Sequence, residues 1–315
     1  MITNAKPKEA RMISYDGLTR LLKQNGLKKS ELTAKLGISS RTIAKISKGE
    51  KIANNVIARL CEFFGCKKED LFTEVCDNAV LQVLREEKEA KISGGLYHET
   101  QVRLTYNSNR IEGSKLSEDQ TRLIFETNTI GAEDGVPVDD IIETANHFRA
   151  IDYVIDCAEE PLTEDLIKKL HKILKTGTKD SYVSWFNVGE YKQKANVVGG
   201  NETTPPSKVA ATIKKLLADY EKKKVGINDI IEFHYNFEKI HPFQDGNGRV
   251  GRLICFKECL RFNIVPFIIE DSKKMFYYRG LKEWNTEKGY LTDTCLDGQD
   301  AYKKLLDYFG IEYRG

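Results

Sequence analysis

The amino-acid sequence predicts a mainly all-α protein, with a small helical bundle at the N-terminus and a larger helical domain after it. Apolar residues recur at helical spacing along most of the 315-residue chain, and serine, threonine and glycine stand where helices would begin and end. Only one segment has the β-branched residues, glycines and prolines of a short β-hairpin. We expect three parts: a helical domain at residues 1–76, a connector helix at 77–96 and a second domain at 97–315.

Composition and cysteine usage are those of an ordinary globular protein. The seven cysteines form neither a C-x-x-C pair nor a paired Cys/His spacing, so we expect reduced thiols rather than a zinc site or a disulfide framework. The sequence has no run of about 18 apolar residues and no N-terminal signal sequence. It therefore predicts a cytoplasmic protein with no membrane partner.

Charge is divided unevenly along the chain, although the formal net charge is only +2. Residues 1–75 contain 15 Lys and Arg against 8 Asp and Glu, a net charge of +7, and the remainder carries 34 against 39, a net charge of −5. A basic domain of this kind favours a polyanionic partner.

The basic end has the layout of a helix-turn-helix. Gly37 stands where a helix would end, and Ser39 stands where the next would begin. Over residues 15–75 the sequence closely resembles the Cro/repressor-type DNA-binding domain, with residues 40–47 in the place of the recognition helix. That resemblance implies six residues at the major groove or its flanking phosphates: Ser39, Ser40, Arg41, Thr42, Lys45 and Lys48.

The sequence does not determine which partner this domain binds. A small helical bundle with solvated lysines would give a similar pattern, and Cro-like modules also serve as protein-binding domains. DNA is therefore one candidate partner. A second copy of the chain is another, because Cro-type domains usually bind paired half-sites as homodimers.

The second domain shows several helix boundaries and one hairpin. Ser117 and Gln120 form a capping box, Thr163 precedes a segment with acids first and lysines last, and Asn228 precedes IIEFHYNFEKI. The segment GEYKQKANVVGGNETTPPS at residues 189–207 predicts a short hairpin or flap.

The stretch IHPFQDGNGRVGR at residues 240–252 lies between two segments with helical spacing, which predicts a helix, a loop and a second helix. Gly246, Asn247 and Gly248 open the second helix, where free backbone N–H groups favour an anion. Arg249 and Arg252 are three residues apart and can share a polyphosphate.

The same loop carries two groups suited to phosphoryl or nucleotidyl transfer. Asp245 supplies the hard carboxylate oxygen that Mg²⁺ prefers, and His241 can act as a base near neutral pH.

Residues 241–252 fit the Fic signature H-x-F-x-D/E-G-N-G-R-x-x-R at every specified position. The second domain therefore resembles the Fic family over roughly residues 97–310. The resemblance implies a protein adenylyltransferase that moves AMP from ATP to a Tyr, Thr or Ser hydroxyl of a target protein or of itself. By that likeness His241 is the base, Asp245 holds Mg²⁺, and the phosphates are bound by Gly246, Asn247, Gly248, Arg249 and Arg252.

Two weaker segments agree with the same resemblance. Val198, Gly199, Gly200 and Asn201 are similar to the hairpin that covers the nucleotide and pairs with the target by strand addition. The resemblance also implies an adenine pocket lined by Tyr277, Tyr278 and Asn285.

The segment SNRIEG fits the family's inhibitory pattern S/T-x-x-x-E-G/N. Ser108 and Glu112 are four residues apart on one helical face, and Gly113 is the expected helix stop. By resemblance Glu112 pairs with Arg252 and misaligns bound ATP. We therefore expect autoinhibition.

Two other readings remain. Glu112 could align water against an AMP-modified protein, which would make the enzyme a de-adenylylase. Alternatively the chain is a DNA-binding transcriptional regulator whose Fic domain senses ATP. Gly248 argues against the phosphorylating members of the family, which have lysine there.

Overall fold

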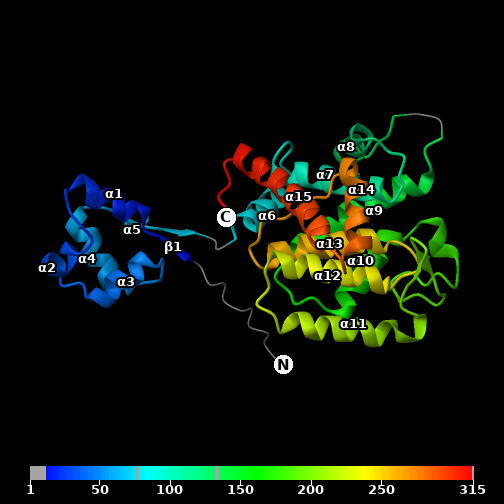
Figure 1. Cartoon of the computed structure of the whole chain (residues 1–315). Coiled ribbons are helices and arrows are strands. Elements are labelled where there is room, and N and C mark those ends of the chain that lie inside the picture. The colour runs from blue at the N-terminus through cyan, green and yellow to red at the C-terminus, as the bar shows by residue number, and fades with distance from the viewer. Residues whose placement is uncertain (1–11, 76–77, 132–134, 314–315) are drawn as a thin grey trace, which may run out of the picture. The chain divides into compact units, whose positions relative to one another are not determined.

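The computed structural model describes residues 12–75, 78–131 and 135–313. These fall into two compact units, Met1–Ala79 and Val80–Gly315, which are called here the N-terminal and C-terminal units (Figure 1). The predicted mainly helical fold is confirmed. Within the described residues, no helix is both long and apolar enough to cross a membrane.

From residue 12 to residue 75, the N-terminal unit has five helices and a two-stranded antiparallel sheet: β1 (Met12–Ser14), α1 (Asp16–Gln24), α2 (Glu31–Leu36), α3 (Ser40–Ser47), α4 (Asn54–Phe64), α5 (Lys68–Leu71) and β2 (Thr73–Val75). Gly37 ends α2 in the left-handed conformation, with φ of 58°. Ser39 begins α3, and its side chain accepts a hydrogen bond from the backbone N–H of Thr42. The helix-turn-helix is therefore built as its turn residues predict. The sheet of β1 and β2 was not anticipated, because three-residue strands leave too short a pattern.

Buried aliphatic side chains hold this unit together. Leu18, Leu32 and Ile38 are almost fully buried, and they pack with apolar residues of α3, α4 and α5. The basic residues of the described part of this unit lie outside this core, at the surface.

The C-terminal unit contains ten helices and one hairpin among its described residues: α6 (Ala79–Ala90), α7 (Leu96–Ile111), α8 (Glu118–Thr127), α9 (Val138–Asp156), α10 (Glu164–Lys175), β3 (Val197–Val198), β4 (Asn201–Glu202), α11 (Pro206–Glu221), α12 (Ile227–Ile240), α13 (Asn247–Arg261), α14 (Lys274–Glu283) and α15 (Gly289–Tyr308). Two short 3₁₀ turns lie at Lys179–Tyr182 and Asp271–Lys273. The expected hairpin is present, with β3 and β4 antiparallel.

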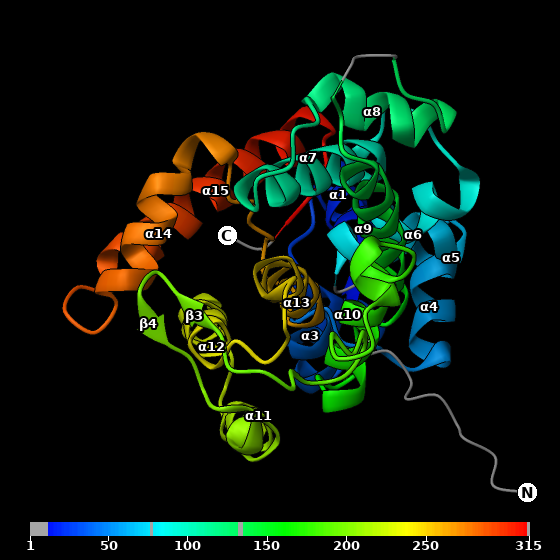
Figure 2. The ribbon, with the colours of Figure 1, turned by 90° about the vertical axis from the view of Figure 1, so that its right-hand side faces the viewer.

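Helix α13 lies at the centre of this unit, in contact with α7, α9, α10 and α12 (Figure 2). Every residue from Asn247 to Leu260 is buried. A helix buried on all sides can carry charges only when they are paired, and Lys257 contacts Glu258 at 2.8 Å in the core. The N-terminal end of α13 therefore has a rigid scaffold around it.

Three helix boundaries test the sequence expectations. The capping box of Ser117 and Gln120 is present, and Thr163 caps α10. The expected cap at Asn228 is wrong, because α12 begins at Ile227 after Gly226, with Asp229 accepting a hydrogen bond from the Gly226 N–H. Helix α6, expected as a connector, buries Val80, Leu81 and Leu84 in the core of the C-terminal unit.

Candidate active site

The loop between α12 and α13 is held in a left-handed conformation at both of its ends. His241 follows α12 with φ of 51°, and Gly246 precedes α13 with φ of 76°. The side chain of Asn247 braces the loop, because it accepts from the Phe243 N–H at 2.8 Å and donates to the Phe243 carbonyl at 3.0 Å. The backbone N–H groups of the first turn of α13 therefore stand at the end of a braced loop that begins at His241.

His241 carries a neutral imidazole at pH 7. Burial, and then the nearby positive charge of Lys192, lower the pKa of its imidazole to about 4. The ring is consequently neutral at pH 7 and can accept a proton. The Glu238 carboxyl lies 4.0 Å from Nδ1 of His241, and burial raises the pKa of Glu238 to about 8, so that carboxyl is largely protonated at neutral pH.

The segment expected to be inhibitory reaches the start of α13. Glu112 follows the end of α7, and its Oε1 lies 2.7 Å from Nη2 of Arg252. Ser108 accepts two hydrogen bonds from the same guanidinium, one at Oγ and one at its carbonyl. A Cβ placed on Gly248 would lie 2.1 Å from the Glu112 oxygen. Glu112 therefore sits directly against the glycine of the expected anion site.

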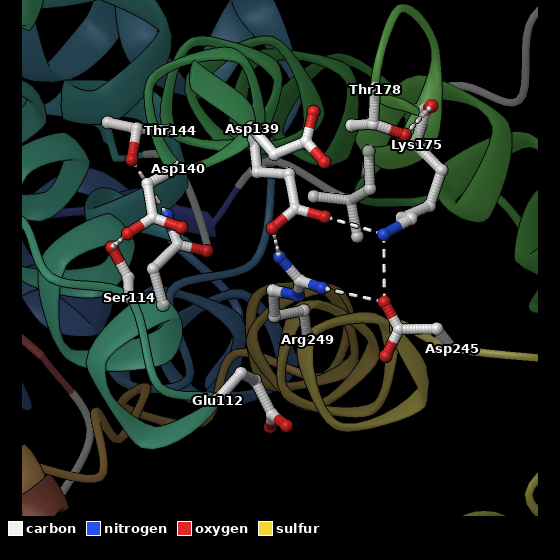
Figure 3. A network of polar contacts seen from close by, with 12 residues as sticks. Glu112, Ser114, Asp139, Asp140, Thr144, Lys175, Thr178, Asp245 and Arg249 are labelled. Carbon is white, nitrogen blue, oxygen red and sulfur yellow. Dashed lines mark hydrogen bonds and ion pairs between the residues drawn. The ribbon is translucent and has the colours of Figure 1, made fainter. Parts of the chain in front are cut away.

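A second polar network surrounds Asp245 (Figure 3). Its Oδ2 lies 2.8 Å from Nζ of Lys175 and 3.4 Å from Nη2 of Arg249. Partial desolvation acts to raise the pKa of Asp245, but Arg249 and Lys175 outweigh it and hold that pKa well below its usual range. Glu143 on α9 contacts both cations. The first arginine of the signature is thus bound by two acids, whereas the second is bound by Glu112.

Two family models match the chain. Residues 161–258 match the Fic/DOC family, and residues 17–77 match the Cro/C1-type helix-turn-helix DNA-binding domain. Residues 161–258 lie within the C-terminal unit, which therefore contains the part of the chain that resembles the Fic/DOC family. Both resemblances expected from the sequence are confirmed.

Curated relatives and solved structures agree with this assignment. Protein adenylyltransferase Fic of Drosophila willistoni is 29% identical over 211 residues, which cover 65% of this chain and 40% of that protein. The protein of the same name in Drosophila melanogaster is 28% identical over 211 residues, covering 65% of this chain and 41% of its own length. The chain thus spans about 40% of the length of the curated relatives it matches.

The solved structures support the fold. A Fic domain containing signaling protein from Bacteroides thetaiotaomicron aligns with a TM-score of 0.59 and 24% identity, covering 75% of this chain and 96% of that one. Fic-1 of C. elegans, residues 134–508, aligns with a TM-score of 0.56 and 18% identity, covering 93% and 83% of the two chains.

The hairpin of β3 and β4 is anchored on the loop between α12 and α13. Lys192 is buried, and its Nζ donates to the side chain of Asn196 at 2.7 Å, while Asn196 donates to the Phe243 carbonyl at 3.2 Å. Gly199 and Gly200 both have positive φ and form the turn. Val198 is 45% exposed, and the side chain of Asn201 lies outside the described part of the structure. The hairpin therefore presents the exposed apolar side chains of Val197 and Val198.

The three residues expected at an adenine pocket differ in exposure. Tyr277 is 1% exposed, and its hydroxyl is 2.8 Å from Nε2 of His234. Tyr278 is 40% exposed and donates to the Ile111 carbonyl, one residue before Glu112. Asn285 is exposed in the turn after α14. Tyr278 therefore lies beside the inhibitory segment, whereas Tyr277 belongs to the core.

The expected DNA-facing residues lie at the start and along one side of α3. Ser39 and Thr42 are occupied with each other, their hydroxyl oxygens being 3.0 Å apart. Ser40, Arg41 and Lys48 are exposed, and Lys45 is half-buried. This surface is basic, as the charge distribution predicts.

Four residues of the site were not found from the sequence: Glu143, Lys175, Lys192 and Glu238. Glu238 lies in the last turn of α12, three residues before His241, a spacing that could have drawn attention to it. The other three come from distant segments, and only the tertiary fold brings them to the loop.

Proposed function

We propose that this protein is an adenylyltransferase that transfers AMP from ATP to a Tyr, Thr or Ser hydroxyl of a target protein or of itself, and that Glu112 holds it inactive. The observation that carries this proposal is the position of Glu112, which pairs with Arg252 and lies against Gly248 at the start of α13. A neutral histidine beside unpaired backbone N–H groups supplies the base and the anion site that the transfer needs.

In the proposed reaction, His241 removes the proton of the target hydroxyl. The hydroxyl oxygen then forms a bond to the α-phosphorus, the bond between that phosphorus and the β-phosphate oxygen breaks, and pyrophosphate leaves. The N–H groups at Asn247 and Gly248 bind the phosphate oxygens through the first turn of α13. Arg252 binds the outer phosphates once Glu112 has moved, because its Nη1 is buried without a partner among the described residues.

Mg²⁺ is the metal ion that this chemistry implies. Asp245 fits it, since its side chain is 52% exposed beside the N-terminus of α13 and offers a hard carboxylate oxygen. The ion would supply neutralisation of phosphate charge when it is bound.

The contact between Glu112 and Arg252 inhibits through charge repulsion and through the position that the Glu112 carboxylate occupies. A carboxylate on Arg252 removes a phosphate partner and repels the phosphate itself, so that ATP binds with its α-phosphorus misaligned. Holding the inhibited form at 99 to 1 requires about 2.7 kcal/mol. Arg252 is 4% exposed and Glu112 30%, and such a partly buried pair with two further hydrogen bonds can reach this value, whereas an exposed pair contributes about 0–1 kcal/mol.

The test is AMP transfer from α-labelled ATP, with Mg²⁺ and a cell lysate, by the parent protein and by Glu112→Gly. We expect the variant to label proteins up to about a hundredfold faster, because loss of a 99-to-1 preference of about 2.7 kcal/mol releases the whole inhibited population. Glu112→Gly combined with His241→Ala is the matched blank. Equal labelling by parent and variant would contradict the inhibitory role.

Loss of label from an AMP-modified protein would instead support de-adenylylation by the same site. The N-terminal unit is proposed to bind DNA through α3, with a second copy of the chain on the paired half-site. Its exposed Arg41 and Lys48 support this proposal.

A further inference from the structure

Lys175, the last residue of α10, is surrounded by acids at the edge of the site. Its side chain is 2% exposed, and Nζ lies 2.6 Å from Glu143, 2.8 Å from Asp180 and 2.8 Å from Asp245. Arg249 adds a second cation that contacts Glu143 and Asp245. The five groups carry a formal net charge of −1, so each buried cation is compensated.

Both cations contact the same oxygen of Asp245, Oδ2 (Figure 3). This arrangement fixes the direction of the carboxylate and places two positive charges next to it. Lys175 and Arg249 therefore compete with a divalent cation for the Asp245 carboxylate. Among the residues the structure describes, no group of three or more His, Cys, Asp or Glu could hold a metal ion, so Asp245 belongs to no larger set of ligands.

We propose that Lys175 is a positioning residue that orients Asp245 and weakens its affinity for a divalent cation, so that the cation binds only together with the phosphates of a nucleotide. The proposal rests on the proposed function for the nucleotide, but the cation affinity of Asp245 can be measured without it. Mg²⁺ is commonly bound by one or two carboxylates together with substrate phosphates, and Lys175 makes that dependence strict.

The experiment is a titration of the full chain with Mn²⁺ alone, followed by electron paramagnetic resonance of the free ion. Lys175→Met removes the competing charge and leaves Glu143, Asp180 and Asp245 facing one another. We expect Mn²⁺ to bind at least about tenfold more tightly than to the parent. Lys179→Met is the matched control, because Lys179 is 82% exposed on the neighbouring turn, and it should bind as the parent does. Equal or weaker binding by Lys175→Met would overturn the proposal.

A second variant should change the affinity for Mn²⁺ in the opposite direction, and it tests the role of Lys175 if Lys175→Met does not fold. Glu143→Gln removes the carboxylate that contacts both Lys175 and Arg249. Both cations then interact more strongly with Asp245. In the presence of a non-hydrolysable ATP analogue, Mn²⁺ should therefore bind this variant more weakly than the parent. Unchanged or tighter binding would contradict the proposal. Lys175→Arg keeps the charge and should restore the parent affinity.

The two proposals fail separately. If neither the parent nor Glu112→Gly transfers AMP, the proposed function fails, while the order of Mn²⁺ affinities still tests Lys175. If AMP is transferred but Lys175→Met binds Mn²⁺ as the parent does, only the inference about Lys175 fails.

Discussion

The two units of this chain place their charges differently. In the N-terminal unit Arg41 and Lys48 are exposed on or beside α3. In the C-terminal unit Lys175, Arg249 and Arg252 are buried and each contacts an acid. Exposed charges act over the distance of the Debye length and weaken with salt, whereas buried charges set the orientation and the pKa of their neighbours. The first arrangement suits attraction of a polyanion, and the second suits a defined chemical site.

The largest expected difference between the units is their response to acid, because all five histidines lie outside residues 1–79. Burial lowers the pKa of His171 and His234 to about 3 and of His241 to about 4, and holds that of His147 well below its usual range. The unfolded chain takes up protons near pH 6.5 and the folded one does not, so stability present above pH 6.5 is lost as the pH falls. Each histidine contributes about 1.4 kcal/mol per pH unit.

Glu238 opposes this loss. Its pKa is raised to about 8, so between pH 8 and its unfolded pKa the folded state binds the extra proton and gains stability as the pH falls. We therefore expect a net loss approaching about 4 kcal/mol per pH unit below pH 6. Both tryptophans, Trp185 and Trp284, lie in the C-terminal unit, so urea unfolding followed by their fluorescence measures that unit alone. An unchanged fluorescence midpoint from pH 7 to pH 5 would refute this account.

A smaller effect should follow from removing one buried cation near the base. Burial is the main reason for the low pKa of His241, and the positive charge of Lys192 lowers that pKa further. Lys192→Met should raise that pKa by about one unit, because a charge within a few ångströms commonly shifts a pKa by one to three units. The double variant Glu112→Gly, Lys192→Met should then lose more of its AMP-transfer activity between pH 7 and pH 5 than Glu112→Gly alone.

The control for this prediction is Lys194→Met, since Lys194 is exposed in the same segment and lies over the ring of Trp185. Circular dichroism at each pH limits the comparison to folded protein. Parallel pH profiles for Lys192→Met and its parent would show that Lys192 does not set the pKa of His241, and Lys192→Arg should restore the parent profile.

The sequence predicts best where a feature depends on neighbouring residues. The turn at Gly37, the cap at Ser39, the hairpin at residues 197–202 and the loop of the signature are all local, and the structure has each of them. The contact of Glu112 with Arg252 spans 140 residues, yet it was expected, because a family resemblance carried information that spacing does not.

Contacts without such a resemblance were missed. Glu143 and Lys175 are ordinary members of amphipathic helices, and Lys175 stands in the last turn of α10, where a lysine is favoured by the helix dipole alone. Their role depends on how α9 and α10 pack around α13, which fixes three-dimensional distances that no local pattern records. Buried ion networks are therefore the part of this site that required a structure.

The smallest expected effect concerns the exposed charges of α3. Arg41→Ala removes one contact to a phosphate or a base, which should weaken binding of duplex DNA by about 1 kcal/mol and reduce the salt dependence of the affinity by about one counterion. AMP transfer in the Glu112→Gly background should not change, because Arg41 belongs to the other unit. Fluorescence anisotropy with DNA from upstream of the protein's own reading frame, at several salt concentrations, measures both quantities. Lys67→Ala, another exposed basic residue of the same unit, should bind as the parent does. If the parent itself binds no DNA, the basic unit recognises a protein instead, and the contrast between the two units concerns docking rather than transcription.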